Sequence, residues 1–187
     1  MPVTTLDPKT ALIVVDLQKG IASFPTIHPM AEVVKNAACL AESFRRHDLA
    51  VVLVNVTGTA PGRAEQGHRG GSLPADFADF LPELSRQPQD YVVTKQTWGA
   101  FSGTDLDAYL RKAGVTQVVL CGVATSIGVE STARYAHELG FNVALAVDAM
   151  TDLSADAHAN SLARIFPRLG ETGTAQEIID LLATRSV

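Results

Sequence analysis

The sequence predicts an α/β fold: a doubly wound, mostly parallel sheet of five to six strands with helices on both faces. Five short runs are nearly continuous in Val, Leu, Ile and Ala, and helical patterns lie between them. With 187 residues the chain is long enough to bury a sizeable core. We therefore expect a single domain over residues 1–187.

The strands are expected where apolar residues run together, because strands of a parallel sheet are buried on both faces. The five runs cover residues 11–16, 50–56, 91–95, 117–123 and 142–150, and a weaker sixth covers 167–172.

The helices are expected between these runs, and their ends carry the usual signals. Pro29 suits a first turn, Gly114 follows a helix end, Pro167 should stop a helix, and Thr174 begins a capping box. The predicted helices cover residues 28–48, 104–114, 130–140, 154–166 and 174–183. The remaining segment, 57–90, is too long for a routine connection, so it is expected to be a lid or an interface element.

Composition excludes several classes of protein. A net charge of −5 with scattered basic residues argues against a nucleic-acid partner. No stretch approaches the ~18 apolar residues of a membrane span, and no basic leader precedes the first apolar run, so we expect a cytoplasmic protein. Cys39 and Cys121 lie in apolar segments without metal-like spacing and are interpreted as two buried thiols in a reducing compartment.

Charged residues stand where strands end, at the edge where doubly wound sheets bind ligands. Asp16 ends the first run and Lys95 the third, so the two could pair there; a helix cap and a solvated edge charge are the alternatives. The fourth run enters "ATSIGVESTAR", residues 124–134, where Thr125 and Ser126 could be nucleophiles or helix caps.

Three blocks in this order resemble the isochorismatase-like cysteine hydrolase superfamily: "ALIVVDLQKGI", "VVTKQTWGAFSGTDL" and "VVLCGVATSIGVESTARYAHELGFNVALAVDAM". The resemblance implies catalytic roles for Asp16 and Lys95, and it places the usual nucleophilic cysteine at Gly128, where this chain has no side chain. Cys121 lies seven residues earlier, within a strand run. The resemblance also implies a cis peptide between Val123 and Ala124.

Without a thiol, the thioester route of the cysteine members is closed. The resemblance implies a small-molecule substrate and vinyl-ether hydrolysis, with Asp16 as general acid and water as nucleophile. Hydrolysis of another enol ether or amide by activated water, and a catalytically inactive metabolite-binding or assembly protein, remain alternatives. The substrate-side candidates, chosen by position, are Gln18, Phe24, Trp98, Ala124 and Thr125.

No metal and no cofactor are expected. The region after the second run contains only His68, without the Asp-x-His pair of the metal-binding relatives. Arg63 and Arg69 could meet a substrate carboxylate or remain solvated. The other histidines, at 28, 47, 137 and 158, are assigned surface or packing roles. The resemblance also implies a homo-oligomer, a dimer or tetramer, with the 57–90 segment and the 130–140 helix as contact surfaces.

Overall fold

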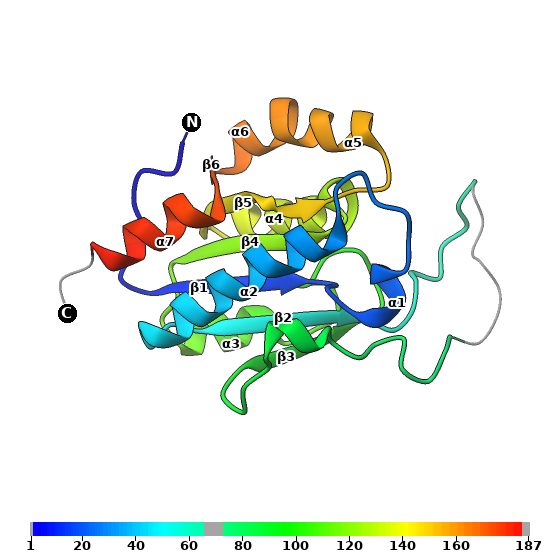
Figure 1. Cartoon of the computed structure of the whole chain (residues 1–187), viewed down its shortest axis with the longest axis horizontal. Coiled ribbons are helices and arrows are strands. Elements are labelled where there is room, and N and C mark those ends of the chain that lie inside the picture. Colours follow the sequence, from blue (N-terminus) through cyan, green and yellow to red (C-terminus); the bar gives the residue numbers. More distant parts are fainter. Residues whose placement is uncertain (1, 66–72, 185–187) are drawn as a thin grey trace.

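A six-stranded parallel sheet forms the centre of the molecule (Figure 1), and it confirms the predicted fold class. The computed structural model describes residues 2–65 and 73–184. The strand order is β3-β2-β1-β4-β5-β6. The chain moves outward from β1 to β3 and then returns to place β4 on the other side of β1, so the topological switch point lies between β1 and β4.

The strands coincide closely with the apolar runs. They are β1 (Thr10–Val15), β2 (Val51–Val56), β3 (Tyr91–Lys95), β4 (Gln117–Val123), β5 (Asn142–Thr151) and β6 (Glu171–Gly173). All residues of β1 and β4 are buried, as expected for the two central strands. The weak sixth run was placed too early, since β6 includes only its last two residues.

Helices cover both faces of the sheet. In Figure 1, α2 (Met30–Arg46) and α7 (Ala175–Ala183) lie in front of it, and α3 (Leu106–Lys112) and α4 (Glu130–Glu138) lie behind it. Two apolar clusters match these layers: one joins the sheet to α2 and α7, and the other joins it to α3 and α4. The capping box of α7 is present, because the Thr174 side chain accepts from the Glu177 N–H and the Glu177 carboxylate accepts in return.

The prediction for residues 154–166 was wrong at its end. The helical path consists of α5 (Ala155–Asn160), the π-helical turn η3 (Ser161–Ile165) and α6 (Phe166–Leu169). Pro167 does not stop it, because this proline occupies the first turn of α6, where its missing N–H leaves no hydrogen bond unmade. A second π-helical turn, η2 (Thr125–Val129), precedes α4.

The prediction of two buried cysteines was half wrong. Cys121 is buried in β4, whereas Cys39 is exposed on α2. The helical period explains the difference, since the buried positions of α2 nearest to it are Ala37, Leu40 and Ala41, and position 39 faces away from them.

The segment 57–90 has little regular structure where it is described. It contains the short helix η1 (Pro82–Leu84), and its backbone is tied to the start of α1 (Lys19–Ala22). The N–H groups of Lys19 and Gly20 donate to the carbonyls of Asp79 and Phe77. Among the described residues, no helix is long and apolar enough to cross a bilayer.

Candidate functional site

Asp16 and Lys95 meet at the carboxyl edge of the sheet. The Lys95 ammonium lies 2.7 Å from Asp16 Oδ2 and also donates to the Thr97 carbonyl at 3.1 Å. The Asp16 side chain is 8% exposed and the Lys95 side chain 1%. Since β3 and β1 are separated by β2, Lys95 reaches across a strand to make this pair. The two strand-end charges that the sequence singled out therefore form a buried ion pair.

The Asp16 carboxylate is only half satisfied. Its Oδ1 is buried and has no hydrogen-bond partner among the described residues. Its backbone is also unusual, with φ of 53° in the left-handed region that favours glycine. Backbone strain and unpaired buried polar atoms both cost free energy and gather at functional sites. Asp16 has both features.

Burial controls the protonation of this carboxyl. Desolvation raises the pKa of Asp16 from 3.8 to about 6, although the charge and the hydrogen bond of Lys95 oppose the shift. The effects of burial and of Lys95 on this pKa oppose each other, and desolvation is the larger of the two. At neutral pH a minority of the molecules therefore carry a protonated Asp16 carboxyl.

Gly128 faces the same carboxylate from η2. A Cβ built on it would lie 3.3 Å from Asp16 Oδ2 and 3.1 Å from the Val123 carbonyl oxygen. A side chain at position 128 would therefore project against Asp16, where the resemblance places the nucleophile. Thr132 fixes this turn, because its hydroxyl donates to the Gly128 carbonyl and accepts from the Ala100 N–H.

The turn between β4 and η2 has the backbone form that the resemblance implied, with a cis peptide between Val123 and Ala124. Gly122 precedes it with φ of 120°, and a Cβ there would stand 2.0 Å from the Val15 carbonyl oxygen. This position can therefore hold only glycine.

Residues from the end of β5 complete the turn, and the sequence interpretation overlooked them. The Asp152 carboxylate accepts from the N–H of Ser126, so one donor of the first turn of η2 is already taken. The Thr125 hydroxyl donates to the Thr151 carbonyl. The signal was available, because Asp152 directly follows a strand, as Asp16 does.

His158 adds a titratable group behind Thr125. Its Nδ1 lies 2.9 Å from Thr125 Oγ1, and because that hydroxyl already donates to a carbonyl, we assign the Nδ1 atom as the donor. Burial lowers the pKa of His158, and the neighbouring His28 ring, 5.0 Å away, lowers it further. These two histidines, assigned surface or packing roles from the sequence, thus lie against the turn.

The predicted substrate-side residues are in different environments. Gln18 is fully buried, and its amide is occupied by backbone groups: it donates to the carbonyls of Val56 and Phe77 and accepts from the Val56 N–H. Ala124 and Thr125 are buried in the turn, Phe24 is partly buried, and Trp98 is 64% exposed. Their contacts with a substrate stay a prediction.

Other sequence candidates add little to the site. Arg63 is exposed, while His68 and Arg69 lie outside the described residues. Within residues 2–65 and 73–184, no cluster of three His, Cys, Asp or Glu side chains could hold a metal ion. Burial raises the pKa of the Cys121 thiol well above its usual range, and its strand position directs it into the core beside α2.

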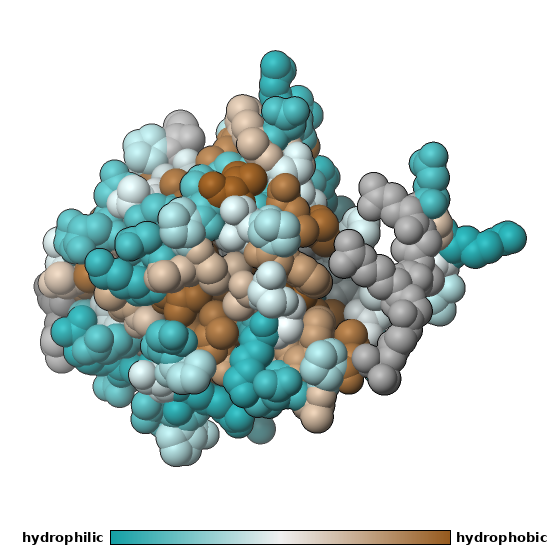
Figure 2. Space-filling model, turned by 45° about the vertical axis from the view of Figure 1, so that its right-hand side comes forward, coloured by the Kyte–Doolittle hydropathy of each residue, from teal (hydrophilic) through white to brown (hydrophobic). Residues whose placement is uncertain are grey.

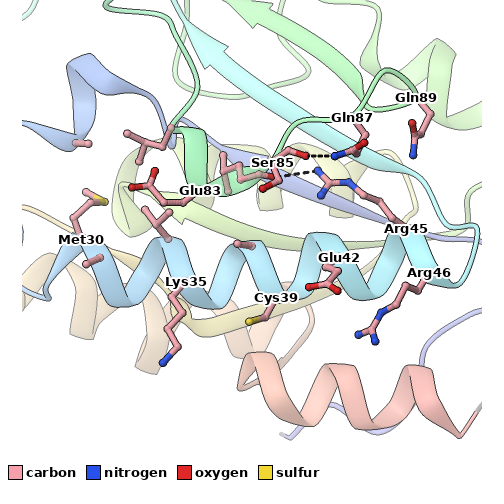
Figure 3. Close-up of a pocket in the computed structure, with 16 residues that line it drawn as sticks. Met30, Lys35, Cys39, Glu42, Arg45, Arg46, Glu83, Ser85, Gln87 and Gln89 are labelled. Carbon is pink, nitrogen blue, oxygen red and sulfur yellow. Dashed lines mark hydrogen bonds between the residues drawn. The ribbon is translucent and has the colours of Figure 1, made fainter.

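A hollow of about 880 Å³ lies elsewhere, between α2 and η1 (Figure 3). Its lining includes neither Asp16 nor Lys95. The strained, half-satisfied Asp16 carboxylate lies instead at the switch point, the region where open α/β sheets bind their ligands.

A doubly wound parallel sheet with a buried acid–base pair at its switch point defines the class of this protein. Residues 10–177 match the isochorismatase domain, and the chain belongs to that family. It is 45% identical to YwoC of Bacillus subtilis, over 92% of this chain and 93% of the relative. It is 43% identical to YecD of Escherichia coli O157:H7, over 92% and 96%. The solved structure of an isochorismatase family protein from Burkholderia thailandensis superposes with a TM-score of 0.93 at 41% identity, covering 96% of this chain and 98% of that one.

Proposed function

We propose that this protein hydrolyses a small vinyl ether, with Asp16 as general acid and water as nucleophile. One observation carries the proposal: a buried carboxyl with a pKa of about 6 and an unpartnered Oδ1 faces a residue without a side chain. A carboxyl of this kind can deliver a proton near neutral pH, which an ordinary aspartate cannot.

The reaction would proceed in two stages. The protonated Asp16 gives its proton to the terminal carbon of the enol ether, and the ether oxygen shares the positive charge of the resulting oxocarbenium ion. Water then adds to the cationic carbon, its proton returns to the carboxylate, and the hemiketal collapses to a ketone and an alcohol. For an enolpyruvyl ether such as isochorismate the ketone is pyruvate.

Lys95 and Gly128 have supporting roles in this proposal. The ammonium of Lys95 holds Oδ2 through its 2.7 Å contact, which leaves Oδ1 for the substrate proton. Position 128 offers no nucleophile, and its turn packs closely against the carboxyl, since a Cβ there would already lie 3.3 Å from Oδ2. Isc1 of Verticillium dahliae, named as a secreted isochorismatase effector, is 29% identical over 81% of this chain, which supports isochorismate as the first substrate to test.

A second candidate is hydrolysis of an amide or another small molecule by water that Asp16 activates as a general base. The streptothricin hydrolase of Streptomyces noursei favours it, with 36% identity over 74% of this chain and 48% of the relative. The two candidates require opposite protonation states of one carboxyl. A general acid loses rate as pH rises above about 6, whereas a general base gains rate until about that pH and then stays level.

The test is pyruvate release from isochorismate as a function of pH. We expect release by the wild type, a descending limb of kcat/KM near pH 6 and at least a ~100-fold loss in Asp16→Asn, the usual range for a lost general acid. Asp156→Asn, a change of an exposed carboxylate in α5, is the matched control. A wild type without pyruvate release excludes the vinyl-ether proposal for this substrate. A metabolite screen then distinguishes the other hydrolase from a binding protein, which would co-purify with a ligand that it does not turn over.

A further inference from the structure

Three hydrogen bonds join the start of the turn η2 to the end of β5 and to α5. The Thr125 hydroxyl donates to the Thr151 carbonyl at 3.1 Å, and the Ser126 N–H donates to the Asp152 carboxylate at 2.7 Å. The third bond, of 2.9 Å, joins Thr125 Oγ1 to Nδ1 of His158. His158 belongs to α5, which begins beyond the carboxyl end of β5 (Figure 1) and packs against η2.

These bonds decide which nitrogen of His158 carries the proton. A carbonyl oxygen can only accept, so the single hydroxyl hydrogen of Thr125 points at Thr151. Oγ1 must then accept from His158, and the proton of the ring is on Nδ1. Burial and then the neighbouring His28 ring lower the pKa of His158, while Asp152 raises it. The ring is therefore mostly neutral at pH 7, with a bare Nε2.

The neighbouring His28 has the opposite arrangement. Thr151 Oγ1 accepts from the His28 N–H at 3.2 Å and lies 3.2 Å from Nδ1 of the same residue. Thr151 is fully buried, and among the described residues this Nδ1 is the acceptor within reach of its hydroxyl hydrogen. His28 thus accepts at Nδ1 and carries its proton on Nε2. The two rings, 5.0 Å apart, are protonated on different nitrogens.

The turn η2 stands between this network and the Asp16 carboxyl. Thr125 begins the turn, and Gly128 packs against Asp16, since a Cβ there would lie 3.3 Å from Oδ2. Thr125 is fully buried, so without a donor its Oγ1 would lose a bond that water could replace only if the turn moved. Figure 2 turns this end of the molecule forward and shows hydrophilic groups among hydrophobic ones at the surface. A displaced turn would therefore admit water to the carboxyl.

We propose that His158 is a positioning residue: by donating from Nδ1 to Thr125, it fixes η2 against the Asp16 carboxyl and keeps water from it. The kinetic consequence rests on the vinyl-ether function proposed above, whereas the placement of the turn does not. The donor, not the charge, performs this role. Asparagine at position 158 can supply a donor where Nδ1 lies, whereas the longer glutamine places its amide near the position of Nε2.

Nitrogen-15 NMR of histidine-labelled protein tests the proton positions. Protonated and bare imidazole nitrogens resonate far apart, and the spectra of His158→Asn and His28→Asn assign the two rings. We expect the proton on Nδ1 in His158 and on Nε2 in His28.

The titration of Asp16, followed by carbon-13 NMR, tests the placement of the turn without a substrate. In His158→Leu the carboxyl becomes better hydrated, so its pKa should fall from about 6 to about 5, toward the ordinary value of 3.8. His158→Gln should act similarly, and His158→Asn should stay near the wild type. His137→Leu, the same change on an exposed position of α4, is the matched control and should have no effect.

Kinetics and a double variant test how the effect is transmitted. In pyruvate release we expect kcat to fall ~10- to 100-fold in His158→Leu with KM within about twofold, because only the placement of the reacting groups is lost. His158→Asn should recover most of the rate. In a Thr125→Val background, His158→Leu should cost nothing further, because both residues act through one hydrogen bond.

Three results would overturn the proposal: a proton on Nε2 instead of Nδ1 in His158, an Asp16 midpoint unchanged in His158→Leu, or an unchanged kcat in that variant. The first two need no substrate, so a wild type without pyruvate release excludes the proposed function while they still decide the role of His158. Should His158→Leu fail to fold, as judged by circular dichroism, the comparison of His158→Asn with His158→Gln takes its place.

Discussion

The balance between burial and Lys95 can be tested directly by replacing Lys95 with methionine. Methionine keeps roughly the length of the side chain and removes its charge, which lies 2.7 Å from Asp16 Oδ2. Both effects of Lys95 lower the pKa of Asp16, and desolvation raises it. Without the lysine only the raising effect remains, so the pKa must move upward from about 6.

The size of the shift follows from the removed charge. An opposite charge at contact distance lowers a carboxyl pKa by about 1–3 units, so we expect a value of about 7–9 in Lys95→Met.

The dependence of the unfolding free energy on pH should change together with this pKa. The pKa of Asp16 in the folded protein already exceeds the unfolded value of 3.8 by about two units. The folded state therefore binds more protons than the unfolded state between pH 3.8 and about 6. As pH rises through that window, the protein loses about 3 kcal/mol of stability. In the variant the loss continues to higher pH, because its folded pKa is higher.

Carbon-13 NMR of aspartate-labelled protein measures this pKa without a substrate, and the spectrum of Asp16→Asn assigns the resonance. Urea unfolding at several pH values measures the stability. The reasoning is refuted if Asp16 titrates below pH 4 in the wild type, or if Lys95→Met leaves its midpoint in place. In the first case the ion pair outweighs burial, and in the second the two side chains are not coupled.

Four further predictions concern the scaffold and the exposure of the two cysteines. Gly114→Ala should cost about 1–2 kcal/mol, because φ there is 71° and the space around it is open. Gly122→Ala should cost more and prevent folding at ordinary temperatures, since its methyl would meet a β1 carbonyl oxygen at 2.0 Å; thermal unfolding compares the two variants. Arg45→Met should lower the unfolding free energy in urea by about 3–5 kcal/mol, because it leaves the fully buried Asp90 carboxylate without its two-pronged partner. A thiol reagent such as Ellman's should label one of the two cysteines, Cys39, in the folded protein and both after unfolding, and two labelled thiols in the folded state would contradict the assigned burial.

The sheet could be predicted because the central strands of a parallel sheet are buried on both faces and therefore appear in the sequence as unbroken apolar runs. Ligands of such sheets bind beyond the carboxyl ends of the strands, so the sequence alone predicted that Asp16, Lys95 and the turn after β4 lie at the same edge. The same rule applied to β5 would have found Asp152. What the sequence could not show is how far a side chain reaches: Lys95 crosses a whole strand, while Gln18 turns its amide onto the backbone.

Two predictions failed because the composition of a segment fixes neither which way a side chain faces nor which type of helix forms. The apolar stretch around Cys39 suggested burial, but its helical phase points the thiol outward. The turn after β4 looked like the start of an α-helix. In the structure it is π-helical, and its first residues donate hydrogen bonds to Thr151 and Asp152, which are distant in sequence.

The glycine at 128 and the titration of Asp16 are best understood together. Any nucleophilic side chain at 128 would begin 3.3 Å from Asp16 Oδ2. A thiolate there would set a second negative charge near the carboxylate, and like charges in one buried site hinder each other's ionisation. One proton would then be shared between them, with Lys95 as the nearby cation. With Gly128 the carboxyl titrates without that competitor, and its proton is available to a substrate instead of a neighbouring nucleophile. Under the function proposed above, the missing side chain thus favours proton transfer from Asp16 over attack by the protein.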